Sequence, residues 1–144
     1  MHLTSIAPDQ RLLDLQHAAY TIEAEIIGDD RIPPLHEDLT ALEKAPLSWL
    51  GAFDDEGTLT GAVAWEESDV LVDINRLIVD PGALRQGIGR TLVKEVLARA
   101  GGRKVIVSTG RDNTPARTLY ERLGFTHTGD AEVIPGLWIT SYEL

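Results

Sequence analysis

The sequence contains no cysteine. This absence excludes disulfide bonds, thiolate metal sites, redox-active dithiols and a cysteine nucleophile, so any chemistry must come from other side chains or from the backbone. Long apolar runs are also missing, and no segment approaches the roughly 18 residues that a membrane-spanning helix needs. The first residues lead to Asp9 rather than to a secretory hydrophobic segment. We therefore expect a cytoplasmic protein without a membrane partner.

Residue patterns typical of metal sites and of serine hydrolases are absent as well. The histidines His2, His17, His36 and His127 do not have the spacing of a zinc site, and we expect no bound metal. No Gly-x-Ser-x-Gly segment occurs, so a serine hydrolase of that type has little support.

Charge is unevenly distributed along the chain. The net charge of −10 argues against a protein that binds nucleic acid through a basic face. However, the segment from Arg85 to Arg122 contains nine basic and three acidic residues, whereas residues 1–73 contain three basic and sixteen acidic ones. This division either places an anionic ligand against the second half and a cationic one near the first, or reflects two solvated surfaces.

The spacing of apolar residues predicts a mixed order of strands and helices. Strands are expected over 2–6, 49–53, 59–65, 70–79, 104–109, 125–134 and 137–142, with helices over 9–28, 88–100 and 115–123 and a short helix around Leu35, Leu39 and Leu42. We found no internal repeat and no long linker. The 144 residues, 43% of them hydrophobic, therefore predict one α/β (α+β) domain over residues 1–144.

A first chemical motif follows the strand that ends at Val79. The chain passes through Asp80-Pro81-Gly82 into Gly87-Ile88-Gly89-Arg90, where a helix is expected to begin. Unpaired backbone N–H groups and the positive end of the helix dipole meet there, and small residues let a phosphate approach. Ile88 and Gly89 stand where a Walker A motif requires lysine and serine or threonine, so the sequence argues against a simple P-loop. The glycines are also compatible with a purely structural tight turn.

A second motif runs from Asn113 to Phe125. Thr114 is predicted to cap the helix, with Pro115 in its first turn and Gly124 at its end. Tyr120 has an apolar ring that can pack and a hydroxyl that needs a partner, as in many tyrosines of a core or its rim.

Together, these motifs resemble the GNAT superfamily of acyl-CoA-dependent N-acetyltransferases. The similarity covers Leu77 to Phe125 and depends on the joint spacing of the Gly-x-Gly turn and the segment Asn-x-x-Ala-x-x-Leu-Tyr-x-x-x-Gly-Phe. The chain departs from the usual motif at Leu84, where the family has glutamine or arginine. The resemblance implies a mixed, mostly antiparallel sheet of about six to seven strands flanked by about four helices.

The resemblance also implies a function and a set of binding residues. The expected reaction is direct transfer of an acetyl group from acetyl-CoA to a primary amine, of a small molecule or a protein, in a ternary complex. By similarity, strand backbone would follow the pantetheine arm, loop amides would hold the pyrophosphate, and the second helix would complete the cofactor site. The residues in question are Leu77, Ile78 and Val79 in the strand, Arg85, Gln86, Gly87, Ile88, Gly89 and Arg90 in the loop, and Asn113, Ala116 and Tyr120 in the second motif.

Tyr120 is the expected general acid, close to the sulfur of the cofactor. A phenol with a pKa near ~10 can protonate a thiolate whose conjugate acid has a pKa near ~8.5 at a small energetic cost.

The general base is left open by the sequence. Strict alternation places Asp73 and Asn75 on the same face of their strand as the apolar Leu77 and Val79. Asp73 also occupies the position at which the histone-type members of the family carry a basic glutamate. Glu66 and Glu67 are alternatives, as are proton transfer through water and a solvated strand end or structural ion pair. A β-bulge would change which residues share a face.

The acceptor and the oligomeric state are also open. Carboxylates between residues 20 and 37 either indicate that the acceptor is a cationic amine or only keep the domain soluble. These carboxylates are Glu23, Glu25, Asp29, Asp30 and Glu37. A non-catalytic acyl-CoA sensor and a nucleotide-binding or interaction module are the alternative functional classes. Trp138 could support a homodimer, or be a buried strand residue.

Overall fold

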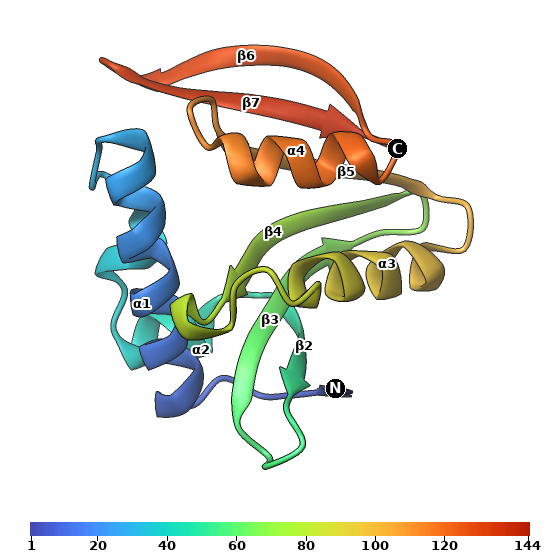
Figure 1. The fold of residues 1–144 in the computed structure, drawn as a ribbon. Coiled ribbons are helices and arrows are strands. Elements are labelled where there is room, and N and C mark those ends of the chain that lie inside the picture. The colour runs from blue at the N-terminus through green and yellow to red at the C-terminus, as the bar shows by residue number, and fades with distance from the viewer.

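A single seven-stranded sheet forms the centre of the computed structural model, which describes residues 1–144 (Figure 1). The strand order is β1-β2-β3-β4-β5-β7-β6, and every neighbouring pair is antiparallel except β4 and β5, which are parallel. The mixed, mostly antiparallel sheet predicted from the sequence is confirmed. The strands are β1 (His2–Ser5), β2 (Ser48–Phe53), β3 (Leu59–Glu67), β4 (Leu71–Val79), β5 (Lys104–Gly110), β6 (Thr126–Ile134) and β7 (Leu137–Glu143).

Local capping explains where the helices begin and end. The Asp9 carboxylate accepts the Leu12 amide at 2.9 Å at the start of α1, and Gly28, with φ 69°, ends that helix in the left-handed conformation. None of the helices combines the length and the apolar character needed to cross a membrane. The helices are α1 (Gln10–Ile27), α2 (Leu39–Lys44), α3 (Ile88–Ala100) and α4 (Thr114–Arg122), with 3₁₀ turns η1 (Pro33–His36) and η2 (Pro81–Ala83).

The start of α4 differs by one residue from the prediction. Asn113, not Thr114, is the N-cap, and its side-chain oxygen accepts the Ala116 amide at 3.3 Å. Thr114 is instead the first helical residue. Asparagine is as good a cap as threonine, and Pro115 is compatible with either register.

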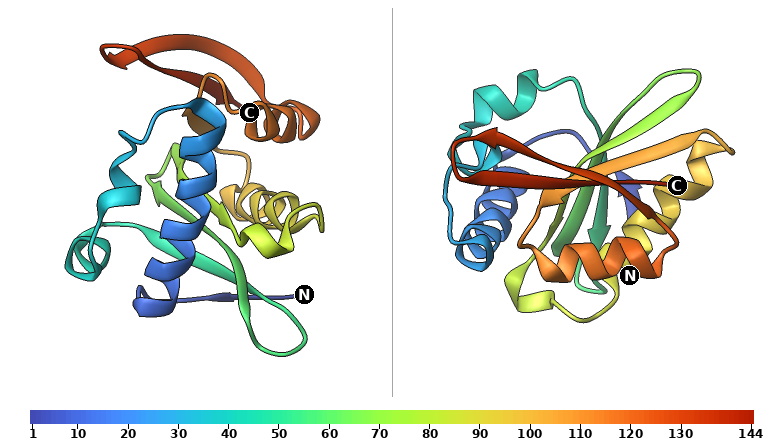
Figure 2. Two further views of the ribbon diagram at one scale, coloured as in Figure 1. Left: turned by 60° about the vertical axis from the view of Figure 1, so that its left-hand side comes forward. Right: turned by 90° about the horizontal axis from the view of Figure 1, so that it is seen from above.

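The helices cover the two faces of the sheet and bury two apolar clusters. Seen from above, α1 lies to one side of the central strands and α3 and α4 to the other, while the β6–β7 hairpin crosses over them (Figure 2). On the α3 and α4 side, Leu92 and Val96 pack with Ile74 of β4. On the α1 and α2 side, Leu12 and Leu42 pack with Ile78, also from β4. Each fully buried leucine contributes about 1.5–3 kcal/mol to stability.

Strand β4 contains a β-bulge at Asn75. Ala64 of β3 pairs with Arg76, and the next residue, Trp65, pairs with Ile74, so Asn75 has no partner in β3. The extra residue reverses the alternation: Ile74 belongs to the cluster beneath α3, whereas Ile78 belongs to the cluster beneath α1. The prediction that Asp73 shares a face with Leu77 is therefore wrong.

Strands β4 and β5 separate beyond the bulge. Their last pair is Ile74 and Val107, but β4 continues to Val79 and β5 to Gly110. The edge of β4 that faces β5 is therefore free of strand partners from Asn75 onward. The candidate site described below lies at this opening in the sheet.

Candidate active site

A cavity of about 270 Å³ opens where β4 and β5 separate. Its floor includes Ile74 and Val107, the last pair of the two strands, and α1 and α4 contribute Tyr20 and Tyr120. Its outer walls come from the segment after α1 and from the β6–β7 hairpin, and they are largely apolar. Such a mostly apolar recess with a few polar groups is typical of a small-molecule site.

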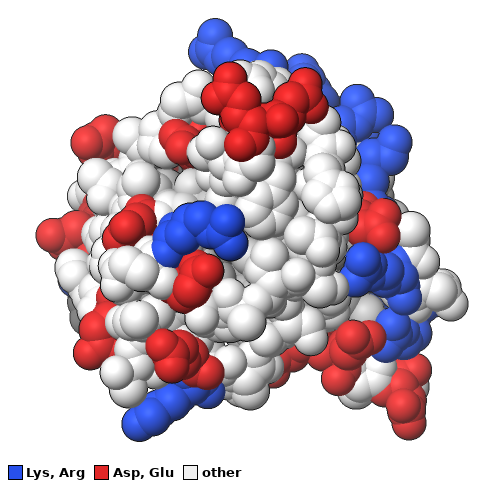
Figure 3. Space-filling model, turned by 90° about the horizontal axis from the view of Figure 1, so that it is seen from below, with Lys and Arg blue, Asp and Glu red and all other residues white.

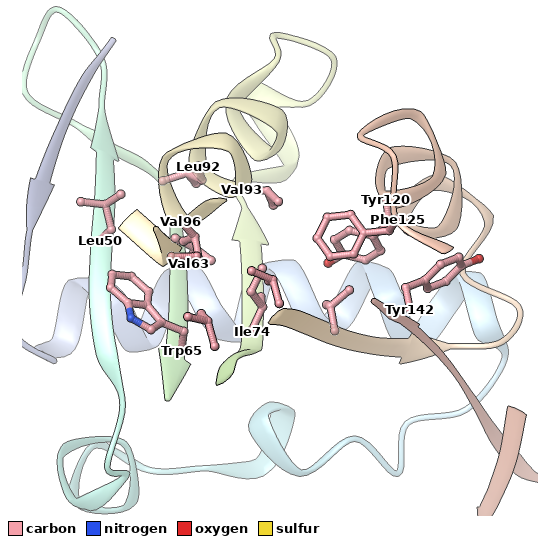
Figure 4. Close-up of a cluster of buried hydrophobic side chains, with 14 of the residues drawn as sticks. Leu50, Val63, Trp65, Ile74, Leu92, Val93, Val96, Tyr120, Phe125 and Tyr142 are labelled. Carbon is pink, nitrogen blue, oxygen red and sulfur yellow. The ribbon is translucent and has the colours of Figure 1, made fainter. Parts of the chain in front are cut away.

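Tyr120 is held firmly by its ring while its hydroxyl is left without a protein partner. The side chain is 3% exposed, and the ring packs edge-on against Phe125 at a centroid distance of 5.6 Å and near Tyr142 at 6.1 Å. The close-up shows the Tyr120 hydroxyl on the side of its ring toward β4, whereas that of Tyr142 points away (Figure 4). The Tyr142 hydroxyl donates to Glu121 at 2.9 Å, but that of Tyr120 has no such bond and faces the cavity.

Burial, and secondly the negative charge of Glu23, raise the pKa of Tyr120. Tyr20, on the opposite wall, has its pKa raised by the same two causes. Both phenols therefore stay protonated at neutral pH.

The loop before α3 presents backbone N–H groups that the fold does not use. The Thr91 amide donates to the Gly87 oxygen at 3.0 Å, and α3 begins at Ile88, so the amides of residues 85–90 precede the hydrogen-bonded part of the helix. Arg85 and Gly87 both adopt positive φ, 65° and 77°. A positive φ is uncommon for arginine, and left-handed residues of this kind are a component of the backbone nests that bind anions.

Gly89, in the first turn of α3, lies beside β4 and α4. A Cβ built on Gly89 would lie 3.6 Å from the side chains of Leu77 and Leu119 and 3.7 Å from Val79. Gly89 is thus close to Leu77, which also lines the cavity. Unused amides before α3, the free backbone edge of β4 and a phenol in the cavity fit a long phosphorylated thioester cofactor such as acetyl-CoA.

A hydrogen-bonded cluster of α1, β5 and α4 forms one wall of the cavity. The Asn113 amide nitrogen donates to the Glu23 carboxylate at 3.1 Å, and the Thr109 hydroxyl donates to the same oxygen at 3.3 Å. Burial raises the pKa of Glu23, although both hydrogen bonds act in the opposite direction. Asn113, Ala116 and Tyr120, predicted as one group from the sequence, all line the cavity.

The predicted general bases lie outside the cavity. Asp73 pairs with Glu66 across β3 and β4, and neither lines the cavity. Burial and then the charge of Glu66 raise the pKa of Asp73. Glu67 is exposed and forms an ion pair with Arg103 at 2.8 Å. The structure thus groups none of these carboxylates with Tyr120.

The carboxylates of residues 20–37 are separated from one another. Glu37 accepts two hydrogen bonds from Arg76, at 2.6 and 2.9 Å, and Asp29 is bound by Arg31 at 2.7 Å. These two charges are neutralised locally. Glu25 and Asp30 lie in a separate surface hollow, which leaves Glu23 as the carboxylate that lines the cavity.

Trp138 is not buried. It is 36% exposed on β7, and the Arg111 guanidinium stacks on its ring at 4.4 Å. The interpretation of Trp138 as a buried strand residue is therefore wrong, and its part in a dimer stays a prediction.

The face seen from below carries basic side chains mainly along its upper and right-hand edges, with acidic groups among them (Figure 3).

Two residues of the cavity were not found from the sequence. Tyr20 was expected only as the start of the acceptor-side segment, and Thr109 only as the end of a strand. The i, i+3 spacing of Tyr20 and Glu23 on one helix places both on the same face and is the signal that could have identified Tyr20.

Comparison with known proteins agrees with this geometry. The family model described as "Acetyltransferase (GNAT) family" matches residues 10–125. The chain belongs to the GNAT family. Among curated proteins, the UPF0157 protein YqkA of Bacillus subtilis (strain 168) is 33% identical over 136 residues, which cover 94% of this chain and 39% of that protein. The peptidyl-lysine N-acetyltransferase YjaB of Salmonella typhimurium is 32% identical over 133 residues, covering 89% of this chain and 79% of YjaB.

Solved structures of this GNAT fold include the protein smu.2055 from Streptococcus mutans UA159. It superposes with a TM-score of 0.79 over 100% of this chain and 98% of its own, at 16% identity. At that identity, the similarity concerns the fold. The chain spans about two fifths of the length of the first curated relatives that it matches.

Proposed function

We propose that this GNAT protein transfers an acetyl group from acetyl-CoA to a primary amine within the cavity between β4 and β5. The observation that carries the proposal is Tyr120, whose ring is buried and whose hydroxyl has no protein partner and faces the cavity. Acetyl-CoA, when bound, supplies an activated acyl group and a thiolate leaving group. A phenol that faces the cavity can donate the proton that the departing thiolate requires.

The amides of residues 85–90 would hold the pyrophosphate, and Arg85 and Arg90 would add positive charge near it. The free edge of β4 beyond Asn75 would run beside the pantetheine arm through its unpaired backbone groups. In this arrangement Leu77 lines the arm by its side chain, whereas the Ile78 side chain is buried on the α1 side and would contribute backbone only.

Tyr120 would donate its proton to the departing sulfur. Asn113 would hold α4 in place through its cap while its amide nitrogen closes the wall beside Glu23. Asp73 and Glu66 stay predictions for the base, but their place outside the cavity favours another proton acceptor or a chain of water molecules. The acceptor would be the amine of a small molecule or of a protein side chain that enters the cavity.

Ligand-dependent stability tests the cofactor directly. A ligand present at about 100 times its Kd stabilises the folded state by about 2.7 kcal/mol. We expect acetyl-CoA and coenzyme A to raise the melting temperature, and ATP and NAD to leave it unchanged. An equal response to ATP or NAD would favour a nucleotide-binding module instead.

Release of coenzyme A thiol with a panel of primary amines tests the reaction. Wild type should release thiol with at least one amine, and Tyr120→Phe should reduce the rate by about 10²–10⁴-fold without a change in coenzyme affinity. Full activity of Tyr120→Phe would remove Tyr120 as the acid. Binding without thiol release across the panel would indicate an acyl-CoA sensor.

A further inference from the structure

The carboxylate of Glu23 occupies an unusual position in the cavity. It comes from α1, yet it is bonded to β5 through Thr109 and to the cap of α4 through Asn113. It is mostly buried, and the phenols of Tyr20 and Tyr120 are near enough for its charge to raise the pKa of both. Glu23 therefore lines the same cavity as the proposed general acid, Tyr120, and as Tyr20.

No cation of the protein neutralises this carboxylate. Its partners, Thr109 and Asn113, are neutral donors, and it forms no ion pair. The arginines that line the same cavity are engaged elsewhere, since Arg31 binds Asp29 and Arg76 binds Glu37. A mostly buried carboxylate is costly unless a cation or a proton joins it, so the cavity favours a positively charged ligand at this point.

We propose that Glu23 binds the ammonium group of the acceptor and accepts one of its protons, which makes the amine nucleophilic. This inference rests on the proposed acetyltransferase function. A single carboxylate among apolar walls made by Ile27, Ile32 and Leu137 fits a monoamine on an apolar chain, such as an alkylamine or a lysine side chain. It does not fit a polyamine, because Glu23 is the one carboxylate that lines the cavity and no second carboxylate there meets the other cation.

The proton balance of the reaction is complete with two residues. One ammonium proton moves to the Glu23 carboxylate, and the nitrogen lone pair then forms the C–N bond as the C–S bond breaks. Tyr120 gives its proton to the sulfur and regains one from the acylated nitrogen. The net proton leaves from Glu23 to water, so the products are the amide, the thiol and one proton.

The test compares Glu23→Gln with Glu25→Gln. In Glu23→Gln, the new side chain keeps the size and an acceptor oxygen for Thr109 and Asn113, but it has no charge and accepts no proton. Glu25 lies on the same helix, is exposed and lies outside the cavity, so it is the matched control. The probes are n-hexylamine, Nα-acetyl-lysine amide and spermidine, each followed by thiol release between pH 6 and 10.

We expect kcat/KM of Glu23→Gln at pH 7 to fall about 10²-fold or more. Because the variant must capture amine that is already neutral, its kcat/KM should rise with pH toward the amine pKa near ~10.4, and the deficit should shrink accordingly. Glu25→Gln should match wild type at every pH. Spermidine should be the poorest of the three acceptors.

Calorimetric titration of n-hexylamine into the protein with bound coenzyme A gives a second readout that needs no turnover. Glu23→Gln should lose at least about tenfold in amine affinity, while its affinity for coenzyme A is unchanged. An equal activity loss at every pH, unchanged activity or unchanged amine affinity would overturn the role of Glu23. If wild type releases no thiol with any amine, the proposed function fails, and the calorimetric result alone decides on Glu23.

Discussion

The two glycines before and within the first turn of α3 are predicted to respond in opposite ways to the same substitution. Gly87 has φ 77°, and nothing lies within 4 Å of a Cβ built on it. Glycine is therefore needed at this position for its left-handed backbone conformation and not for lack of space. Gly89 has ordinary helical geometry, and its added Cβ would make normal contacts of 3.6–3.7 Å. Alanine therefore strains the backbone at Gly87 but fits at Gly89.

The magnitudes follow from these local differences. The left-handed conformation costs a residue with a Cβ about 1–2 kcal/mol, so Gly87→Ala should lower the melting temperature by about 2–8 °C. Glycine in a helix is up to about 1 kcal/mol less favourable than alanine, so Gly89→Ala should leave stability unchanged or raise it. Relief of the strain at Gly87 would turn the loop amides away from a bound phosphate. Loss of one hydrogen bond to a charged group, worth about 1.5–3 kcal/mol, would weaken acetyl-CoA binding by about 10- to 100-fold.

Thermal denaturation of the free protein, followed by calorimetric titration with acetyl-CoA, measures both effects. Gly87→Ala should be less stable and bind weakly, and Gly89→Ala should be at least as stable and bind better than Gly87→Ala. If Gly87→Ala were less stable but bound acetyl-CoA like wild type, the loop amides would not be the phosphate site. If its melting temperature rose, the argument from φ would be refuted.

Three further variants test stability and its pH dependence. Tyr120→Phe should melt within about 2 °C of wild type, because the ring contacts remain and the hydroxyl has no protein partner to lose. Burial opposes ionisation of Glu37, but hydrogen bonds from Arg76 and Gln16 and the charge of Arg76 together outweigh burial and lower the pKa of Glu37. The stability that ionised Glu37 contributes should be lost as pH falls below its unfolded pKa. Glu37→Gln should destabilise the protein by about 1–3 kcal/mol at pH 7, as judged by urea unfolding. Glu23 has the opposite effect on stability because its pKa is raised in the folded protein, so its ionisation destabilises the fold as pH rises. Glu23→Gln should therefore gain stability relative to wild type between acidic and neutral pH. A pH-independent difference for Glu23→Gln would contradict this reasoning.

Much of the fold follows from signals that are local in the chain. The Asp9 cap, the Gly28 stop and the periodic apolar residues between them define α1 within a residue or two. The Gly-x-Gly turn and the helix that contains Tyr120 were both located correctly. Such elements are predictable because the residues that fix them lie within one or two turns of each other.

The bulge in β4 was not predictable in the same way. Asn75 is one residue in a strand that reads as continuous, and the shift of register depends on how β3 pairs with it. The consequence is large, since it moves Asp73 and Leu77 to opposite faces. The argument from strict alternation that placed Asp73 on the face of Leu77 therefore does not hold, and Asp73 as the base stays a prediction.

The contact between Glu23 and Asn113 also depends on tertiary structure. Through its charge, Glu23 links the two proposed proton transfers. The charge of Glu23 is one cause of the raised pKa of Tyr120. The ammonium group of a bound acceptor offsets that charge, and transfer of its proton to Glu23 keeps the pair neutral, so the pKa of Tyr120 should fall once the acceptor is bound. The phenol is then a stronger acid at the stage when the departing sulfur needs a proton, so neutralisation of Glu23 should favour the step that Tyr120 performs. In a double-mutant cycle, Glu23→Gln and Tyr120→Phe should therefore have non-additive effects on kcat/KM, whereas additive effects would show that the two groups act independently.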